Sequence, residues 1–515
     1  MKQRNYSRLS PKRGWSWETP PQPPHAVAET LESDVVVVGG GVSGLAAGAR
    51  CAQLGLKVSV LEQAELAPGQ PKPVAALDSP LLRQLGIDID KAAAARDWMA
   101  VSGSRADERL LWQFLRRSGE ALRWLCSLAG EGTRLTLLDG GYRGPGFREY
   151  PVAHLLTPQG GGVEEALAPA AILERALETF GGKLYRPVRA LWLETAADGR
   201  VAAVLARGAD GRERRYAARR GVVLATGGIG GDEELMTAFC PLGRKPALRL
   251  CAPGGEGRKG DGHRLAYWAG AALELPSWPV AFRNQAYGPY SLFFLHVNRL
   301  GRRFMNEDSW EQAKAIRCLM QPGGDYAYTI MDGKWLAEYG ARFPLLGGAG
   351  VLPPYLAAHG KVWSPFCGLR EEVEGAIRAG LGAQADSLEG LAAQLSLPPD
   401  TLRETVKRYN VLATFGEDLD YGKRRELLTP VLQPPFYALK WGPALEEVYG
   451  GILTDTEMRA LDPEGQPVPG LLAVGNAAGG FFGVDHPRLL EGVDTGRALV
   501  SALALADGLM KRGGV

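Results

Sequence analysis

A β-branched run that leads directly into a glycine-rich turn constrains the fold of this 515-residue chain more than any other feature. Val35–Val38 is typical of a buried parallel strand, and Gly39-Gly40-Gly41-Val42-Ser43-Gly44 follows it at once. An alanine-rich helix then runs to Gly55, and a second strand over residues 57–61 stops at Glu62. Because strand, helix and strand follow in this order, the sequence predicts the βαβ unit of a Rossmann-like α/β fold.

The spacing of the glycines predicts a dinucleotide site in this unit. Gly39 permits the tight turn after the strand, Gly41 lets the backbone approach a pyrophosphate, and Gly44 lets the helix pack closely on the strand. Glu62 ends the second strand, where its carboxylate can accept hydrogen bonds from both hydroxyls of an adenosine ribose. The motif alone leaves the identity of the dinucleotide open, although its single occurrence argues against separate FAD and NAD folds.

Charge and cysteine usage narrow the partners and the compartment. The 59 basic and 57 acidic residues leave a net charge of +2, so no overall field attracts nucleic acid or an anionic membrane, and small-molecule partners are expected. The six cysteines have no short paired spacing, which predicts no metal site, no disulfide framework and a reducing compartment. Neither a secretory signal nor a membrane span is expected, and the chain is predicted to be cytoplasmic.

The nucleotide-binding pattern returns near the C-terminus. An apolar run over 471–474 is closed by Gly475-Asn476, and a glycine-punctuated helix begins near Val493, whereas the long middle segment is irregular and rich in aromatic residues. A chain that leaves a fold and returns to it implies an inserted domain, with the active site at the seam. We therefore predict an N-terminal arm (1–30), a dinucleotide-binding domain in two parts (31–235 and 436–515) and an α+β capping domain for the substrate (236–435).

Three local patterns predict elements within these parts. Residues 81–130 are expected to be mostly helical, and residues 201–205 are expected to form a hairpin with the arginine tract over 212–220. A leucine stripe that starts at Leu388 and resumes at Leu402 predicts a pair of helices.

A series of ordered motifs resembles the superfamily of FAD-dependent fumarate reductases, succinate dehydrogenases and 3-ketosteroid dehydrogenases. The resemblance covers roughly residues 33–505 and rests on Asp34–Gly48 with Glu62, Leu224–Gly228, Gly260–Gly262, Gly301–Glu307, Pro435–Ala438, Gly450–Ile452 and Pro469–Asn476. It implies FAD, a fold of the glutathione-reductase type interrupted by a capping domain, and hydride exchange between flavin N5 and a substrate carbon. The segment 485–488, together with Gly496-Arg497-Ala498-Leu499, also resembles a branch common in anaerobic bacteria that includes tetrahydrodaidzein reductase.

The resemblance also assigns cofactor contacts. Val188 resembles the position whose backbone amide and carbonyl read the adenine, and the helix after Gly492 would direct its positive end at the flavin N1/O2 edge. The segment 63–80 lacks the histidine of flavinylated relatives, so the FAD is expected to be non-covalent. The full predicted set is Gly39, Gly41, Val42, Ser43, Gly44, Glu62, Gln63, Val188, Ala225, Thr226, Gly227, Asp261, Gly451, Gly475, Asn476, Gly492 and Val493.

The catalytic positions depart from the fumarate reductase pattern. Glu311 stands at the place of the proton-donating arginine, and Glu447, with Tyr449 beside it, stands at the place of the carboxylate-binding histidine. The C-terminal arginine clamp falls at His486, with Arg488 two positions on. Two glutamates would repel a dianion, so fumarate is not the expected substrate.

Tyr449 and His486 are the predicted proton donors. Glu311 and Glu447 are either acids of raised pKa or ion-pair partners of arginines such as Arg303 and Arg317. Aromatic residues of the inserted domain and the flavin-side turn are predicted to form a flat, apolar pocket: Trp278, Phe282, Tyr287, Tyr290, Phe293, Phe294, Phe481 and Phe482.

Three functions follow from these observations. The first is an FAD-dependent reductase of a polyphenol-like or isoflavonoid-like substrate with an unsaturated or benzylic oxygenated carbon. The second is a ketosteroid-type dehydrogenase that introduces a C=C bond, which a tyrosinate at position 449 beside a cation would favour. The third is a flavin-bearing electron-transfer subunit without a substrate of its own. The sequence leaves the electron donor and the oligomeric state open.

Overall fold

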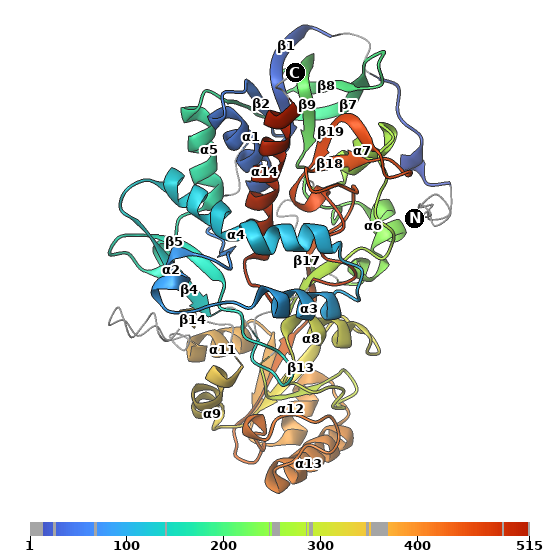
Figure 1. Ribbon diagram of the computed structural model, residues 1–515. Helices are drawn as coiled ribbons and strands as arrows, with labels where there is room; N and C mark the ends of the chain where they lie inside the picture. Colours follow the sequence, from blue (N-terminus) through green and yellow to red (C-terminus); the bar gives the residue numbers. More distant parts are fainter. Residues whose placement is uncertain are drawn as a thin grey trace.

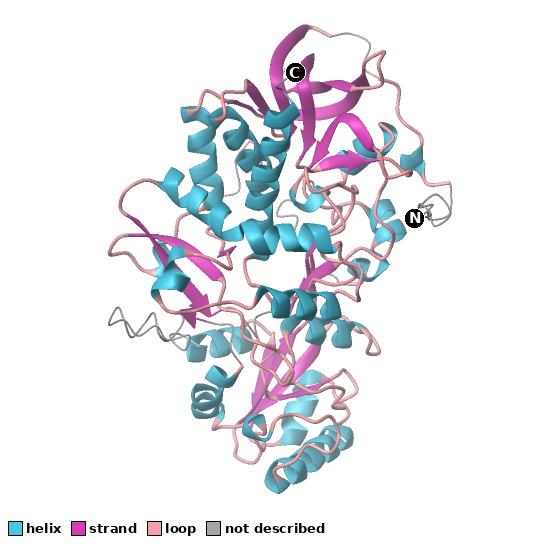
Figure 2. Ribbon diagram, viewed as in Figure 1, coloured by secondary structure: helices cyan, strands magenta, loops and turns pink. Residues whose placement is uncertain are grey.

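The computed structural model describes residues 14–23, 27–65, 69–139, 142–246, 248–249, 258–284, 286–287, 292–346, 350–351, 369–486 and 489–512. Figure 1 shows a larger body that contains both ends of the described chain and a smaller body that carries α9, α12 and α13. Figure 2 shows that the larger body contains both helices and strands.

One eight-stranded sheet organises the larger body. Its main order is β18-β19-β9-β1-β2-β6, and β7 and β8 extend it beside β9. The strands are β1 (Glu29–Val38), β2 (Val58–Leu61), β6 (Lys183–Tyr185), β7 (Val188–Thr195), β8 (Val201–Gly208), β9 (Glu213–Leu224), β18 (Arg459–Leu461) and β19 (Pro467–Ala473). Since β1 pairs in parallel with β2 and β9, and β19 pairs in parallel with β9, strands from the two ends of the sequence share this sheet.

The predicted βαβ unit and hairpin are confirmed. Helix α1 (Val42–Gln53) connects β1 and β2, and β8 pairs antiparallel with β9 through the arginine tract. Strand β1 begins at Glu29, six residues before the predicted apolar run at Val35, because residues 29–33 pair with residues 214–218 of β9. This extension has no apolar pattern that the sequence could reveal.

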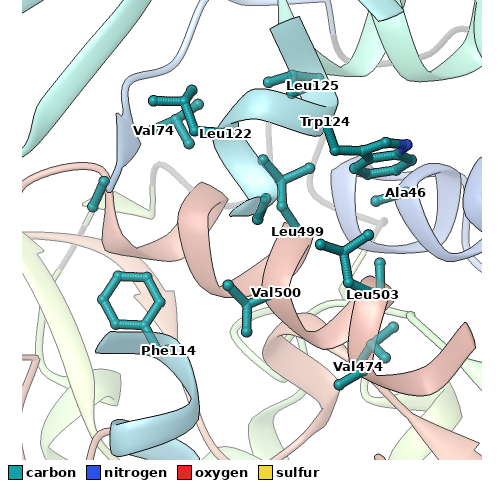
Figure 3. Packing of buried hydrophobic residues seen from close by; sticks show 14 of the residues in the cluster. Ala46, Val74, Phe114, Leu122, Trp124, Leu125, Val474, Leu499, Val500 and Leu503 are labelled. Atoms are coloured by element: carbon teal, nitrogen blue, oxygen red, sulfur yellow. The ribbon is translucent and has the colours of Figure 1, made fainter. Parts of the chain in front are cut away.

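Four helices cover one side of the sheet. Helix α14 (Val493–Arg512) packs against α1 and against α4 (Glu108–Ala129), and α5 (Pro169–Thr179) packs against α1. Figure 3 shows the resulting core, in which Ala46, Leu122 and Leu499 come from three different helices. Gly48 lets α1 approach the sheet, because a Cβ there would lie 2.9 Å from Val60 Cγ2.

The predicted helical region 81–130 is also confirmed. It contains α2 (Pro80–Gln84), α3 (Lys91–Val101) and α4. A four-stranded sheet in the order β14-β4-β5-β3 combines strands from before and after this region: β3 (Val74–Ala75), β4 (Thr133–Asp139), β5 (Ala153–Pro158) and β14 (Gly350–Val351).

The smaller body is built on the sheet β12-β13-β16-β15. Its strands are β12 (Leu295–Val297), β13 (Ala327–Met331), β15 (Gly382–Ala385) and β16 (Phe436–Trp441), and its helices are α9 (Trp335–Arg342), α11 (Leu369–Arg378), α12 (Leu388–Leu395) and α13 (Pro399–Phe415). The helix pair α12 and α13 matches the predicted leucine stripe. The predicted domain boundaries stay a prediction, and the pairing of β16 with β13 and β15 favours a return to the larger body after residue 441.

A three-stranded sheet, β10-β17-β11, joins the two bodies near the seam. It consists of β10 (Leu248–Arg249), β11 (Val280–Arg283) and β17 (Ala444–Val448), and it is flanked by α6 (Glu233–Phe239), α7 (Asp261–Trp268) and α8 (Glu311–Leu319). The described part of the N-terminal arm docks by Trp17, whose ring packs on Phe239 and whose carbonyl accepts from Trp268 Nε1 at 2.8 Å.

Candidate active site and cofactor cradle

The glycine turn has the geometry of a dinucleotide cradle. Gly39 has a φ of +110°, and a Cβ there would lie 2.3 Å from Ala225 O. A Cβ at Gly44 would lie 1.9 Å from Gly39 O, so this glycine lets α1 approach the turn. At Gly41, by contrast, no described atom lies within 4 Å of the position a Cβ would take. The turn is therefore closed toward the protein and open where a pyrophosphate is predicted to lie.

Glu62 lies at this turn as predicted. Its Oε2 accepts from Gly40 N at 2.5 Å and its Oε1 accepts from Ala64 N at 2.8 Å, which fixes the carboxylate at the end of β2. Gln63 follows it in an exposed loop. The amide of Val188 donates to Glu62 O at 2.7 Å, and its predicted contact with the adenine stays a prediction. A role for the Val188 carbonyl stays a prediction.

The end of β9 supplies a second wall. Ala225 N donates to Val38 O at 2.8 Å, and Gly227 has a φ of +75°. The hydroxyl of Thr226 is buried and has no hydrogen-bond partner among the described residues. Asp261, at the start of α7, pairs with Arg189 of β7 at 3.2 Å. An unpaired buried hydroxyl in a glycine-lined wall fits the approach of a polar ligand such as a dinucleotide.

The third wall comes from the C-terminal segment. A Cβ at Gly475 would lie 2.0 Å from Ser43 Oγ, which places the start of α1 directly against this turn. Asn476 Oδ1 accepts from Arg497 Nη2 at 3.1 Å. Gly451 has a φ of +148° and lies against the buried ring of His263. Residues far apart in sequence thus converge around one glycine-lined space.

The N-terminus of α14 lies beside these turns. Gly492 packs against 73–75, and its carbonyl accepts from Ala75 N at 2.9 Å. Val493 is buried and begins the helix, so its first turn has the place predicted for the electropositive end. Asp494 is the acidic residue of that turn.

Tyr449 and His486 meet at Asp494. Tyr449 donates its hydroxyl proton to Asp494 Oδ2 at 2.8 Å, and His486 Nε2 lies 3.2 Å from Asp494 Oδ1. The two rings are 4.6 Å apart between centroids, and Phe482 stacks on His486 at 4.8 Å. We call this group the Tyr449–Asp494–His486 cluster. The structure therefore brings the two predicted proton donors together through a carboxylate that the sequence did not single out.

The pKa values of Tyr449 and Asp494 are shifted in opposite directions. Burial, reinforced by Asp494, raises the pKa of Tyr449 well above its usual value. Burial opposes ionisation of Asp494 as well, but His486, Tyr449 and Arg497 hold the pKa of that carboxyl down to about 2. His486 Nδ1 is buried and has no hydrogen-bond partner within the part of the chain that the structure describes. A charged carboxylate at Nε2 and an unpaired Nδ1 are the arrangement of a histidine that can carry a proton on both nitrogens.

Both predicted glutamates are ion-paired, but not with the expected arginines. Glu447 pairs with Arg258 at 2.5 Å, and Glu311 pairs with Arg283 at 3.2 Å. Arg303 instead pairs with Glu307 and Asp418, and Arg317 donates to Ser309 Oγ. Burial raises the pKa of Glu447, although Arg258 opposes the shift. The repulsion that these glutamates would exert on a dianion is therefore weaker than predicted.

The remaining predictions concern Arg488 and the aromatic residues of the predicted pocket. Arg488 and Tyr290 lie outside the described residues. Six of the predicted pocket aromatics belong to the hydrophobic core instead, because they are buried among other apolar side chains: Trp278, Phe282, Phe293, Phe294, Phe481 and Phe482. Tyr287 packs on Lys440, while Phe481 and Phe482 face the guanidinium of Arg497.

Sequence reasoning missed two buried charged residues. Arg497 is 6 % exposed and donates to Gly475 O and Ala478 O, so it supports the turn that carries Asn476. Glu274 is 7 % exposed and accepts from Gly480 N at 3.1 Å, and burial raises its pKa to about 7. A charged residue close to a glycine turn in sequence could have indicated each of them. Their hydrogen-bond partners lie 19 to 206 residues away, so the sequence did not show the contacts.

Comparison with known proteins identifies this cradle. A family model with the description "FAD binding domain" matches residues 34–486 of this chain. The chain belongs to the FAD binding domain family. It is 27 % identical to a vinyl phenol reductase of Lactiplantibacillus plantarum over 91 % of this chain and 94 % of that protein. It is 28 % identical to a 4-oxocyclohexanecarboxylate 2-dehydrogenase of Sinomonas cyclohexanicum, over 88 % and 89 % of the two chains.

Solved structures share the fold of this FAD binding domain protein. A 3-ketosteroid dehydrogenase from Rhodococcus jostii superposes with a TM-score of 0.69 at 23 % identity, covering 94 % of this chain and 97 % of that one. A flavocytochrome c3 fumarate reductase also superposes with a TM-score of 0.69, at 22 % identity, over 95 % and 80 % of the two chains. The predicted superfamily and α/β fold class are confirmed.

The protein is thus an FAD-dependent oxidoreductase. The described residues fit FAD: the turn is open at Gly41, Glu62 is held at the end of β2 where the ribose is predicted to lie, and the Thr226 hydroxyl has no described partner in the wall. The individual cofactor contacts stay predictions. None of the described helices combines the length and the hydropathy that a membrane crossing needs.

Proposed function

We propose that the protein reduces an unsaturated or benzylic oxygenated carbon of a flat, largely apolar aromatic substrate, and that fumarate is not its substrate. The observation that carries the proposal is the Tyr449–Asp494–His486 cluster. By the resemblance, its His486 falls at the position of the C-terminal arginine clamp of fumarate reductases. Similarity to a vinyl phenol reductase along almost the full chain supports a C=C bond conjugated to a phenol ring as the reacting group. The FAD is proposed to be bound without a covalent link.

FAD, once reduced by an external electron donor, would supply the hydride, and the chain must supply the proton. His486 is the proposed donor, through Nδ1. Asp494 stays ionised and stabilises an imidazolium at Nε2, while no described residue accepts from Nδ1. Tyr449 fixes the second oxygen of Asp494 and thereby orients the pair. Phe482 stacks on the imidazole and keeps water from its face.

The direction of the reaction follows from Tyr449. A dehydrogenase of the ketosteroid type would use a tyrosinate beside a cation as its base. Here Tyr449 is buried and hydrogen-bonds a carboxylate, and both disfavour the tyrosinate that such a base requires. Arg258 and Arg283 are held by Glu447 and Glu311, so neither offers an unshared guanidinium to a dicarboxylate.

Anaerobic turnover with reduced viologen as the electron donor tests the proposal. A panel of vinyl phenols, aromatic enones and dicarboxylates is compared, with the products identified by mass. We expect the aromatic compounds to gain two hydrogens and fumarate to remain unchanged. Turnover of fumarate alone, or of no compound in the panel, would refute the proposal.

A further inference from the structure

A group of polar residues at the far end of β11 is not used by the proposed reaction. Arg283 ends β11 and donates to Glu446 Oε1 at 2.8 Å and to Glu311 Oε2 at 3.2 Å. Asn284 follows it, and its amide donates to Glu311 Oε1 at 3.0 Å while its side-chain nitrogen donates to Glu311 O at 2.9 Å. The side chain of Arg283 thus connects three segments: β11, β17 and the start of α8.

The carbonyl oxygen of this Asn284 side chain is the unusual atom. Asn284 is 1 % exposed, and its Oδ1 is buried without a hydrogen-bond partner among the described residues. Its orientation is set by the bond from Asn284 Nδ2 to Glu311 O, so the side chain cannot rotate to satisfy Oδ1 without losing that bond. Since buried acceptors are nearly always paired, a donor from outside the chain is the natural complement.

The surroundings determine which donor fits. Glu311 and Glu446 are acceptors, and the guanidinium of Arg283 is already shared between them. Glu491 adds a further negative charge that raises the pKa of Arg283. A carboxylate would meet these acids without an unshared cation, whereas a neutral hydroxyl can donate to Asn284 Oδ1.

The group is connected to the Tyr449–Asp494–His486 cluster. Gln312, next to Glu311, donates to Asp485 Oδ1 at 2.6 Å, and the same oxygen accepts from His486 N at 2.8 Å. On the sheet side, Val280 pairs with Val448, the residue before Tyr449. Asn284 is four residues farther along the strand, which corresponds to about 13 Å.

We infer that Asn284 Oδ1 is the acceptor for a phenolic hydroxyl at the end of the substrate farthest from the reacting carbon. This inference rests on the proposed function and refines it, because a substrate that spans this distance has two or three linked rings rather than one. It makes the site selective for a neutral hydroxyl over an ether or a carboxylate at that end.

Three compounds with one skeleton test the inference: para-hydroxychalcone, para-methoxychalcone and para-carboxychalcone. Each is flat and conjugated, and they differ only in the group at one end. In the native protein we expect kcat/KM for the hydroxyl compound to exceed that for the ether at least about tenfold. In Asn284→Ala the preference should fall to near one, through loss of turnover of the hydroxyl compound.

Two further variants separate recognition from a structural effect. Asn284→Asp keeps an acceptor at the position but loses the bond to Glu311 O, and we expect it to keep a preference for the hydroxyl. Asn410→Ala removes an equivalent amide from α13, where it bonds Val431, and should leave the preference unchanged. FAD content measures whether each variant folds.

The outcomes are distinct. If no chalcone oxidises the reduced flavin, the proposed function fails. If all three react but the native protein does not prefer the hydroxyl compound, or if Asn284→Ala keeps the full preference, the inference fails while the proposed function stands. Equal loss of preference in Asn284→Asp and Asn284→Ala would also overturn the inference, because it would trace the effect to the bond with Glu311.

Discussion

Two glycines of the same turn should respond in opposite ways to an added side chain. A Cβ at Gly41 meets no described atom within 4 Å, and the φ of −74° and ψ of −179° suit any residue. A Cβ at Gly44 would lie 1.9 Å from Gly39 O and 3.2 Å from Ala225 Cβ. The larger change, Gly41→Val, is therefore expected to spare the folded chain, and the smaller change, Gly44→Ala, to damage it.

The magnitudes follow from these contacts. Gly41 is the N-cap of α1, and replacing it costs about 1 kcal/mol of apoprotein stability at most. Gly44→Ala must displace α1 from the turn, which costs about 1–3 kcal/mol. FAD present at 100 times its dissociation constant adds about 2.7 kcal/mol to the native protein, and Gly41→Val should lose all of this increment because its side chain occupies the pyrophosphate position.

Urea unfolding of the apoprotein and of the protein with added FAD measures both quantities, with flavin absorbance as a check of occupancy. We expect apo Gly41→Val to have a urea midpoint close to that of the native apoprotein. Added FAD should not raise the midpoint of this variant. Gly44→Ala should unfold at lower urea in both conditions. Full flavin occupancy in Gly41→Val would show that the pyrophosphate does not lie at this turn, and a native apoprotein midpoint in Gly44→Ala would contradict the packing argument.

Three other changes test separate parts of the account. His486→Gln should slow flavin reoxidation by substrate about 10²-fold or more, and Tyr449→Phe about tenfold, with unchanged FAD content; stopped-flow absorbance measures both, and a native rate in His486→Gln would remove it as the donor. Glu274 has a pKa raised by burial to about 7, so the folded state binds its proton more tightly than the unfolded state and stability should fall as pH rises from about 4.5 to 7, by up to about 3 kcal/mol. Glu274→Gln should remove that fall in urea unfolding across this pH range, and an unchanged pH profile would refute the assignment. Acid precipitation should release all flavin into the supernatant, whereas yellow colour on the denatured chain would mean a covalent link.

The sequence predicted the elements whose signals are local. The β-branched run of β1, the alanine-rich α1 and the glycine spacing between them depend on neighbours within a few residues, and the structure forms them as expected. The start of β1 at Glu29 was missed because its polar residues join the sheet only by pairing with β9.

The candidate site was predicted only in part, because its contacts are long-range. Tyr449 and Asp494 are 45 residues apart, and Arg258 and Glu447 are 189 residues apart. Each pair forms only when the C-terminal helix and the β17 strand close on the nucleotide-binding body. The pocket aromatics failed for a related reason: a dense aromatic segment has the same pattern whether it lines a cavity or fills a core, and Trp278 and Phe282 fill one.

The central claim is that this FAD-dependent oxidoreductase reduces an aromatic unsaturated substrate rather than fumarate. A single-turnover experiment tests it most directly: the protein is reduced under argon and mixed either with a vinyl phenol or chalcone, or with fumarate, while flavin absorbance is followed. We predict rapid return of the oxidised flavin spectrum with the aromatic compound and none with fumarate. Reoxidation by fumarate, with the aromatic compounds inert, would contradict the account.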